Sequence, residues 1–207
     1  MPDHRTDQTA EWNARYGEKD AMWSGRPNGR LVAELEGLTP GRALDVGCGE
    51  GADAIWLAQK GWTVTAIDVS DVAIDRARAA AARAGAAVEW ICGDAQQTTE
   101  LPARAFDLVS MQYPALPKAA GDAAVRTLLA AVQTGGVLLA VYHDLDDEHR
   151  AHMKSRGHDP DDYVGADDLV GLLGDDFTLE LHTVEPRVDP PPDTPHIADI
   201  VVRARRR

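Results

Sequence analysis

Residues 43–51 read ALDVGCGEG, which predicts a buried strand that turns sharply into a helix. A short apolar strand at 43–47 runs directly into a turn built from three glycines, Gly47, Gly49 and Gly51. Glycine lets the backbone turn tightly and lets a ligand approach it closely. Residues 51–60 then have the composition of a helix, and its start offers free N–H groups to a carboxylate or a phosphate.

The same alternation of strand and helix continues toward the C-terminus. Apolar runs predict strands at 62–68, 87–94, 105–113 and 137–143, with helices over 71–84 and 121–134 between them. Ser70 is placed to cap the first of these helices and Gly85 to end it. Strands that alternate with helices of this length are typical of βαβ units and a parallel sheet.

The chain ends differently, because residues 177–185 and 197–205 predict two strands with no helix between them. Such a pair must be antiparallel, since a parallel crossover needs a dozen or more residues and usually a helix. The sequence therefore predicts an α/β fold with a doubly wound, mostly parallel seven-stranded sheet and one antiparallel strand. We expect a single domain over 1–207, with an N-terminal segment at 1–28 and a core at 29–207.

Composition narrows the functional classes. The chain has 207 residues and a formal net charge of −13, which repels phosphate backbones and argues against a nucleic-acid partner. The sequence contains no run of 18 apolar residues, so it predicts no membrane-spanning helix. Its polar first residues lack the apolar core of a signal peptide. Cys48 and Cys92 both fall in segments that read as buried, so we expect a reduced, cytoplasmic setting.

Acidic residues follow three successive strands of the predicted sheet. In an open α/β sheet, ligands bind at the carboxyl ends of the strands, where Asp45, Asp68 and Asp94 all fall. A carboxylate at Asp68 can accept both hydroxyls of a ribose, and one at Asp94 can accept from the exocyclic amine of adenine. A tight turn without a ligand explains the glycines alone, and the glycine spacing also fits a dinucleotide fingerprint. A tight turn that binds no ligand does not account for the glycines and the three strand-end acids together.

The series TPGRALDVGCGEG, VTAIDVS, ICGDAQ, FDLVSMQY and GGVLLAV resembles the class I S-adenosylmethionine-dependent methyltransferases over roughly residues 28–143. The resemblance implies a Rossmann-like methyltransferase fold with S-adenosylmethionine as cofactor. It implies that the glycine loop, Cys48 included, wraps the methionine part, with Asp45 near its amino group. It also implies the remaining cofactor contacts, which are Asp68 for the ribose, Val69, Asp94 and Ala95 for the adenine, and Met111 and Gln112 near the sulfonium.

Electrostatics favour the same cofactor. The acids of the rim, with Glu50 among them, suit a sulfonium and an ammonium better than a pyrophosphate. The activity implied is transfer of a methyl group to a small-molecule nucleophile by in-line displacement. Two alternatives remain, which are a non-catalytic module that binds S-adenosylmethionine and an NAD(P)-dependent oxidoreductase.

The acceptor side is predicted from residues outside the cofactor motif. The N-terminal segment resembles, more loosely, the lid of the tellurite-resistance and thiopurine methyltransferase group. That resemblance implies that Tyr16, Trp23 and Arg26 close over the cofactor. We predict a substrate-binding role for these three residues and for Tyr113, which follows the fourth strand. The alternative is a fixed first helix that docks on the core through Trp12 and Tyr16.

Two further features lie toward the same rim. His143, at the end of the fifth strand, is a candidate general base, or else a histidine bonded into its loop. The proline-rich loop 185–196 belongs on the same rim, as a pocket wall or as a stiff connector. The acidic and histidine-rich stretch at 144–158 includes His149 and His152 at one-face spacing, but we predict no metal there.

Overall fold

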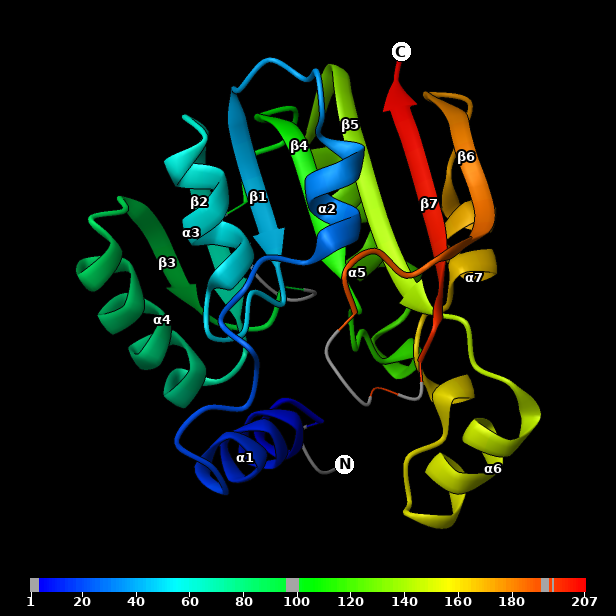
Figure 1. The fold of residues 1–207 in the computed structure, drawn as a ribbon. Helices are drawn as coiled ribbons and strands as arrows, with labels where there is room; N and C mark the ends of the chain where they lie inside the picture. Colours follow the sequence, from blue (N-terminus) through cyan, green and yellow to red (C-terminus); the bar gives the residue numbers. More distant parts are fainter. Residues whose placement is uncertain (1–3, 96–100, 191–193, 195) are drawn as a thin grey trace.

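A seven-stranded sheet with the order β3-β2-β1-β4-β5-β7-β6 forms the centre of the molecule (Figure 1). The computed structural model describes residues 4–95, 101–190, 194 and 196–207. The strands are β1 (Arg42–Val46), β2 (Thr63–Asp68), β3 (Val88–Cys92), β4 (Phe106–Gln112), β5 (Val132–His143), β6 (Phe177–Pro186) and β7 (Ala198–Arg206).

All neighbouring strands are parallel except at β7, which runs antiparallel to both β5 and β6. This arrangement confirms the predicted fold class. Because β7 is reversed, its first residues lie at the edge of the sheet where the parallel strands end. His143 of β5 consequently lies opposite Asp199 of β7.

Helices cover both faces of the sheet (Figure 1). They are α1 (His4–Gly17), α2 (Gly29–Glu34), α3 (Ala52–Gln59), α4 (Asp71–Ala84), α5 (Asp122–Ala131), α6 (Asp147–Ser155) and α7 (Ala166–Leu172), with short 3₁₀ turns η1 (Lys118–Ala120) and η2 (Pro160–Asp162). α2 and α3 pack on one face, and α5 and α7 pack on the opposite face. α1 lies beyond the carboxyl edge of the sheet and contacts α4. None of the described helices is long and apolar enough to span a bilayer.

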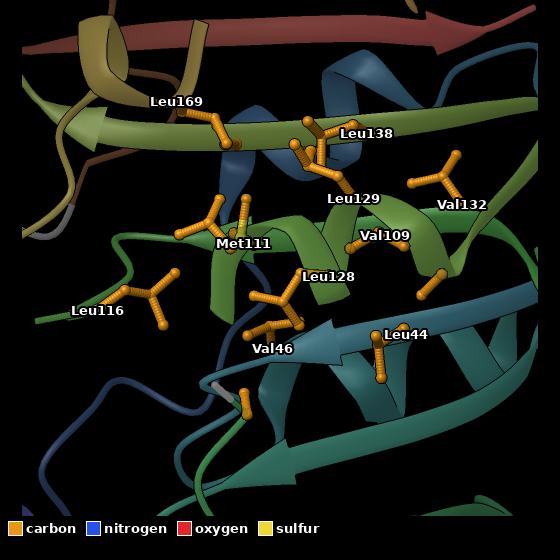
Figure 2. Packing of buried hydrophobic residues seen from close by; sticks show 14 of the residues in the cluster. Leu44, Val46, Val109, Met111, Leu116, Leu128, Leu129, Val132, Leu138 and Leu169 are labelled. Atoms are coloured by element: carbon orange, nitrogen blue, oxygen red, sulfur yellow. The ribbon is translucent and has the colours of Figure 1, made fainter. Parts of the chain in front are cut away.

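Two hydrophobic clusters hold these layers, because successive side chains of a strand point to opposite faces. Leu44 and Val46 of β1 pack with Met111, Leu128 and other residues of the α5 face, as Figure 2 shows. Ala43 packs with the α2 and α3 face instead. Asp45 alternates with Leu44 and Val46, so its carboxyl lies on the α3 side of the sheet.

The structure corrects the predicted helix at 121–134. The helix ends at Ala131, and β5 begins at Val132 and runs through Gly135 and Gly136. Val132 pairs with Phe106 of β4, and the register then shifts so that Leu108 pairs with Val137. Pairing with a buried strand overrides the helical pattern of these residues.

Two other differences concern the surface. Cys92 is exposed at the end of β3, which is an edge strand and has a neighbour on one side only. The prediction that both cysteines lie in buried segments is therefore wrong for Cys92. The helices α6 and α7 lie between β5 and β6, in a region where the sequence predicts no element.

Candidate functional site

The glycine loop joins β1 to α3 and is held by β2. Gly47, Gly49 and Gly51 all have positive φ angles, of 70°, 54° and 84°. The backbone N–H of Gly47 donates to the Ile67 carbonyl at 2.8 Å. Asp68 accepts a hydrogen bond from the Gly49 N–H at 2.8 Å and another from the Ser70 N–H at 2.9 Å. This carboxylate therefore shapes the loop as well as lying beside it.

Two glycines of the loop are required for different reasons. A Cβ added to Gly51 would lie 2.6 Å from the Trp90 ring and 2.9 Å from the Cβ of Ala77, so this glycine permits close packing. A Cβ at Gly47 would meet nothing within 4 Å. Gly47 thus presents its backbone to open space, as a loop that receives a ligand must.

Three buried carboxyls gather behind the loop, on Asp45, Asp53 and Asp68. Burial raises the pKa of each, and the charges of Asp53 and Asp68 raise the pKa of Asp45 further. Within the described part of the chain, none of these carboxyls takes part in an ion pair, and the Oδ2 atom of Asp45 has no hydrogen-bond partner. Buried carboxylates without a counter-charge favour a cationic ligand. The ammonium and sulfonium groups of S-adenosylmethionine are cations that fit these carboxyls.

The residues predicted for the adenine lie beside Asp68. Val69 directly follows Asp68 and is half-buried. Cys92 pairs with Asp68, and the Gly93 N–H donates to the Asp68 carbonyl at 2.9 Å, which brings Asp94 and Ala95 to the same edge. The fold thus collects these predicted residues at the ends of β2 and β3.

Met111 and Gln112 end β4 next to the glycine strand, where Met111 pairs with Val46. Both are buried, and the Gln112 side-chain amide donates to Ser110 Oγ at 3.1 Å. The Oε1 atom of Gln112 is buried and has no partner in the described structure. Tyr113 follows with a φ of 53°, a conformation that non-glycine residues adopt rarely and that often marks a functional site.

Tyr113 and His143 belong to a group of stacked rings at this edge. The Tyr113 ring stacks on His143 with centroids 4.1 Å apart, and His143 stacks on His196 at 4.4 Å. The Tyr113 hydroxyl donates to Asp199 Oδ1 at 3.0 Å. Burial raises the pKa of both Tyr113 and Asp199. Burial, together with the charges of His196 and Arg187, lowers the pKa of His143 to about 3. His143 is therefore neutral at physiological pH and a weak proton acceptor.

The N-terminal segment lies over the glycine loop. Tyr16 is buried, and its hydroxyl accepts a hydrogen bond from the Trp23 indole N–H at 3.1 Å. A Cβ at Gly49 would lie 2.9 Å from that hydroxyl, so Tyr16 covers the loop directly. The rings of Trp12 and Tyr16 lie 6.0 Å apart, as their spacing predicts. Arg26 is directed toward the segment after β6 instead, where it forms an exposed ion pair with Asp189.

Three residues beside the predicted substrate residue Tyr113 were not identified from the sequence, and these are Arg187, His196 and Asp199. The first two fall in the loop 185–196 predicted for this rim, and both contact the Tyr113 group. Residues 191–193 and 195 of that loop lie outside the described residues. An acid within the apolar run IADIVV is the signal for Asp199, since the reversed last strand must begin at the ligand edge.

Comparison with known proteins agrees with this geometry. Residues 43–136 match the family model of a methyltransferase domain. Glycine N-methyltransferase of Oryctolagus cuniculus is 31% identical over 136 residues, which cover 58% of this chain and 44% of that enzyme.

Two solved structures extend the likeness to nearly the whole chain. A protein studied for the conversion of a disulfide bond into a thioacetal group during echinomycin biosynthesis is 27% identical, with a TM-score of 0.75 over 96% of this chain and 92% of that one. The N-methyltransferase NodS of Bradyrhizobium japonicum, in complex with S-adenosylhomocysteine, has a TM-score of 0.65 at 21% identity over 86% of this chain and 84% of that one.

The chain thus contains a methyltransferase domain over residues 43–136 and has the fold of the S-adenosylmethionine-dependent methyltransferases, with S-adenosylmethionine as the cofactor that this domain implies. The match to the rabbit enzyme spans less than half of that enzyme's length.

Proposed function

We propose that this chain transfers a methyl group from S-adenosylmethionine to a nucleophile of a small molecule by in-line displacement. The observation that carries the proposal is the glycine loop backed by three buried carboxyls that form no ion pair within the described residues. This loop lies in the part of the chain that matches a methyltransferase domain. The acceptor's place is the neighbouring edge at Gln112 and Tyr113. When bound, the cofactor supplies a methyl group already activated by its sulfonium.

The residues of the chain have three tasks in this proposal. Asp68 and the loop from Gly47 to Gly51 hold the cofactor, and Asp45 faces its ammonium. Tyr16 and Trp23 exclude water from the loop, and we propose that residues 1–28 act as a lid. Alignment of the nucleophile contributes about 7–11 kcal/mol to lowering such a barrier, so a soft nucleophile requires no strong base.

Charge supports a small acceptor, and the two free cysteines support a reduced, cytoplasmic setting. A net charge of −13 disfavours a nucleic-acid substrate. The rabbit relative carries the name of an amino-acid N-methyltransferase, which is consistent with a small acceptor. We propose the same class of acceptor for this chain.

Two alternatives make different demands on the site. An NAD(P)-dependent oxidoreductase requires the glycine loop to hold a pyrophosphate, which the carboxyls of Asp45, Asp53 and Asp68 oppose electrostatically. A non-catalytic module keeps the cofactor site but shows no turnover. Binding separates the first alternative from the proposal, and turnover separates the second.

Calorimetry on the full chain tests binding. We expect S-adenosylmethionine to bind in the micromolar range and more tightly than NAD. Asp68→Ala is expected to weaken binding by about 2–3 kcal/mol, because it removes a charge-assisted acceptor from two hydroxyls. Asp75→Ala removes an exposed carboxylate of α4 and is the matched control. Tighter binding of NAD, or an unchanged affinity in Asp68→Ala, contradicts the proposed site.

A methyl-labelled cofactor then tests turnover. The acceptors to compare are thiols, phenols, amines and chalcogen oxyanions, followed by an untargeted metabolite extract. Label in a small molecule supports the proposal. Binding without transfer to any of them supports the non-catalytic module.

A further inference from the structure

A small polar cavity lies between the N-terminal segment and the segment that follows β6. Its volume is about 40 Å³, and it is lined by Arg26, Asn28, Tyr113, Arg187 and Asp189 among others. The two walls meet at Gly29, where an added Cβ would lie 2.2 Å from the Val188 carbonyl oxygen. Arg30 also donates to the Pro186 carbonyl at 2.8 Å. The cavity is therefore built by two segments that are far apart in the sequence.

The position of the cavity relates it to the reacting centre. Tyr113, which lines it, directly follows the buried end of β4. Asn28, which also lines it, donates two hydrogen bonds of 2.7 Å to Asp53, behind the glycine loop. A ligand in the cavity therefore lies next to the cofactor site, on its acceptor side.

The charge of the cavity is opposite to that of the loop beside it. Two arginines and one aspartate line it, in a chain whose net charge is −13. Arg187 is half-buried, its guanidinium lies over the Tyr113 ring at 5.1 Å, and it enters no ion pair within the described residues. Its side chain also donates to the Thr194 hydroxyl, at 3.4 Å, which leaves donors available.

Backbone strain gathers at the same place. The described residues include three non-glycine residues with positive φ, and two of them, Tyr113 at 53° and Asp189 at 46°, line this cavity. Such conformations persist where the surrounding structure imposes them, and they cluster at ligand sites. The exposed pair of Arg26 and Asp189, at 3.0 Å, is weak enough to open when a ligand enters.

We propose that this cavity binds an anionic group of the methyl acceptor, a carboxylate or another oxyanion, with Arg187 as its main ligand and Arg26 at its rim. The planar fork of a guanidinium matches a carboxylate with two parallel hydrogen bonds. The inference rests on the proposed methyl transfer, and it names the acceptor as an acid whose nucleophile lies near Tyr113. The acidic loop then receives the cationic cofactor, and the basic cavity receives the anionic acceptor.

Direct binding of simple probes to the full chain tests this site without turnover. Benzoate and its neutral isostere benzamide are titrated, with and without saturating S-adenosylhomocysteine, and followed by calorimetry. We expect benzoate to bind at least tenfold more tightly than benzamide. Arg187→Gln is expected to weaken benzoate binding at least tenfold, and Arg187→Lys less, since it keeps the charge without the fork.

Arg26→Gln provides a second test if the Arg187 variants fail to fold, because Arg26 is exposed and its replacement leaves the fold intact. It is expected to weaken benzoate binding about two- to fivefold. Arg78→Gln is the matched control, since the Arg78 side chain is as exposed as that of Arg26, at 52%, and pairs with the similarly exposed Asp75. Equal binding of benzoate and benzamide, or equal benzoate affinity in folded Arg187→Gln and the unmodified chain, overturns the inference.

The titration of S-adenosylhomocysteine separates this inference from the proposed function. Tight cofactor binding without a preference for benzoate removes the anion site and leaves the proposed function intact. A preference for benzoate without any binding of S-adenosylhomocysteine or S-adenosylmethionine removes the proposed function. In that case it also removes the acceptor role of the cavity.

Discussion

Glu50 of the glycine loop and Arg76 of α4 form an ion pair at 2.9 Å that attaches the N-terminal segment to the core. The Glu50 carboxylate also accepts hydrogen bonds from the backbone N–H groups of Met22 and Trp23. The Arg76 guanidinium donates to the carbonyls of Tyr16 and Lys19. One pair of side chains therefore holds both halves of the turn that covers the glycine loop.

Glu50→Gln is expected to loosen this attachment. Loss of the charge weakens three charge-assisted hydrogen bonds, so amide hydrogen exchange over residues 10–24 should become faster. In the unmodified chain we expect this region to gain protection when S-adenosylhomocysteine binds, as a lid does. Asp75→Asn, on the exposed face of α4, should change nothing. The contrary result is strong protection of residues 10–24 from hydrogen exchange that neither S-adenosylhomocysteine nor Glu50→Gln changes. It would mean that this segment is fixed on the core, and it would contradict the lid hypothesis.

Gly47→Ala and Gly51→Ala should separate ligand binding from stability. Both place an alanine at positive φ, which lowers the free energy of unfolding by about 1–2 kcal/mol. Gly51→Ala adds a clash with Trp90 and Ala77, and we expect a further loss of about 1–3 kcal/mol. Gly47→Ala meets no protein atom but enters the space assigned to the cofactor, so cofactor affinity should fall about tenfold or more. Denaturant unfolding and calorimetry measure the two effects. A larger loss of stability in Gly47→Ala, together with a larger loss of cofactor affinity in Gly51→Ala, would contradict these separate roles of the two glycines.

Cofactor binding should release protons at mildly acidic pH. Burial raises the pKa of Asp45, Asp53 and Asp68 in the cofactor-free protein. The stability that these carboxyls contribute is complete below their unfolded pKa of about 4, and it is lost as the pH rises through the raised values.

A bound cation favours the ionised carboxyls, so the affinity for S-adenosylmethionine should rise with pH across that window. Calorimetry in buffers of different ionisation enthalpy counts the protons, and Asp45→Asn should reduce the number. A pH-independent affinity with no proton release would show that these carboxyls do not face the cofactor's charge.

His143→Phe tests the predicted general base. The pKa of about 3 keeps His143 neutral from pH 5 to pH 9, and its ring lies between Tyr113 and His196. We expect a phenyl ring to preserve the stack, with kcat reduced less than about tenfold and a flat pH–rate profile for the unmodified chain in this range. General-base catalysis contributes about 10²–10⁴-fold. If His143→Phe instead lowers kcat by that factor at unchanged KM, and also abolishes a pH dependence of the rate seen in the unmodified chain, then His143 is the base.

Local sequence patterns specify the layers of the fold and the edge of the sheet that carries the predicted cofactor residues. Strand and helix periodicities are local, and the glycines with their following acids stand at strand ends, so Gly47, Asp68 and Asp94 needed no long-range information. Parallel strands end at one edge of the sheet, and this rule brings the predicted cofactor residues together. The antiparallel last pair followed equally from the lack of a helix between residues 185 and 197.

The predicted acceptor side depends on contacts between segments that are far apart in the sequence. Asp199 approaches Tyr113 because β7 runs backward beside β5, and Arg187 reaches the same ring across a loop that periodicity does not describe. The start of β5 at Val132 depends on pairing with β4, which overrides local helix propensity. Burial also decided the protonation of His143, since the pKa of an imidazole depends on the groups packed around it and not on its neighbours in the chain. Local patterns specify elements and their ends, whereas the contacts between distant segments arise only when the sheet is assembled.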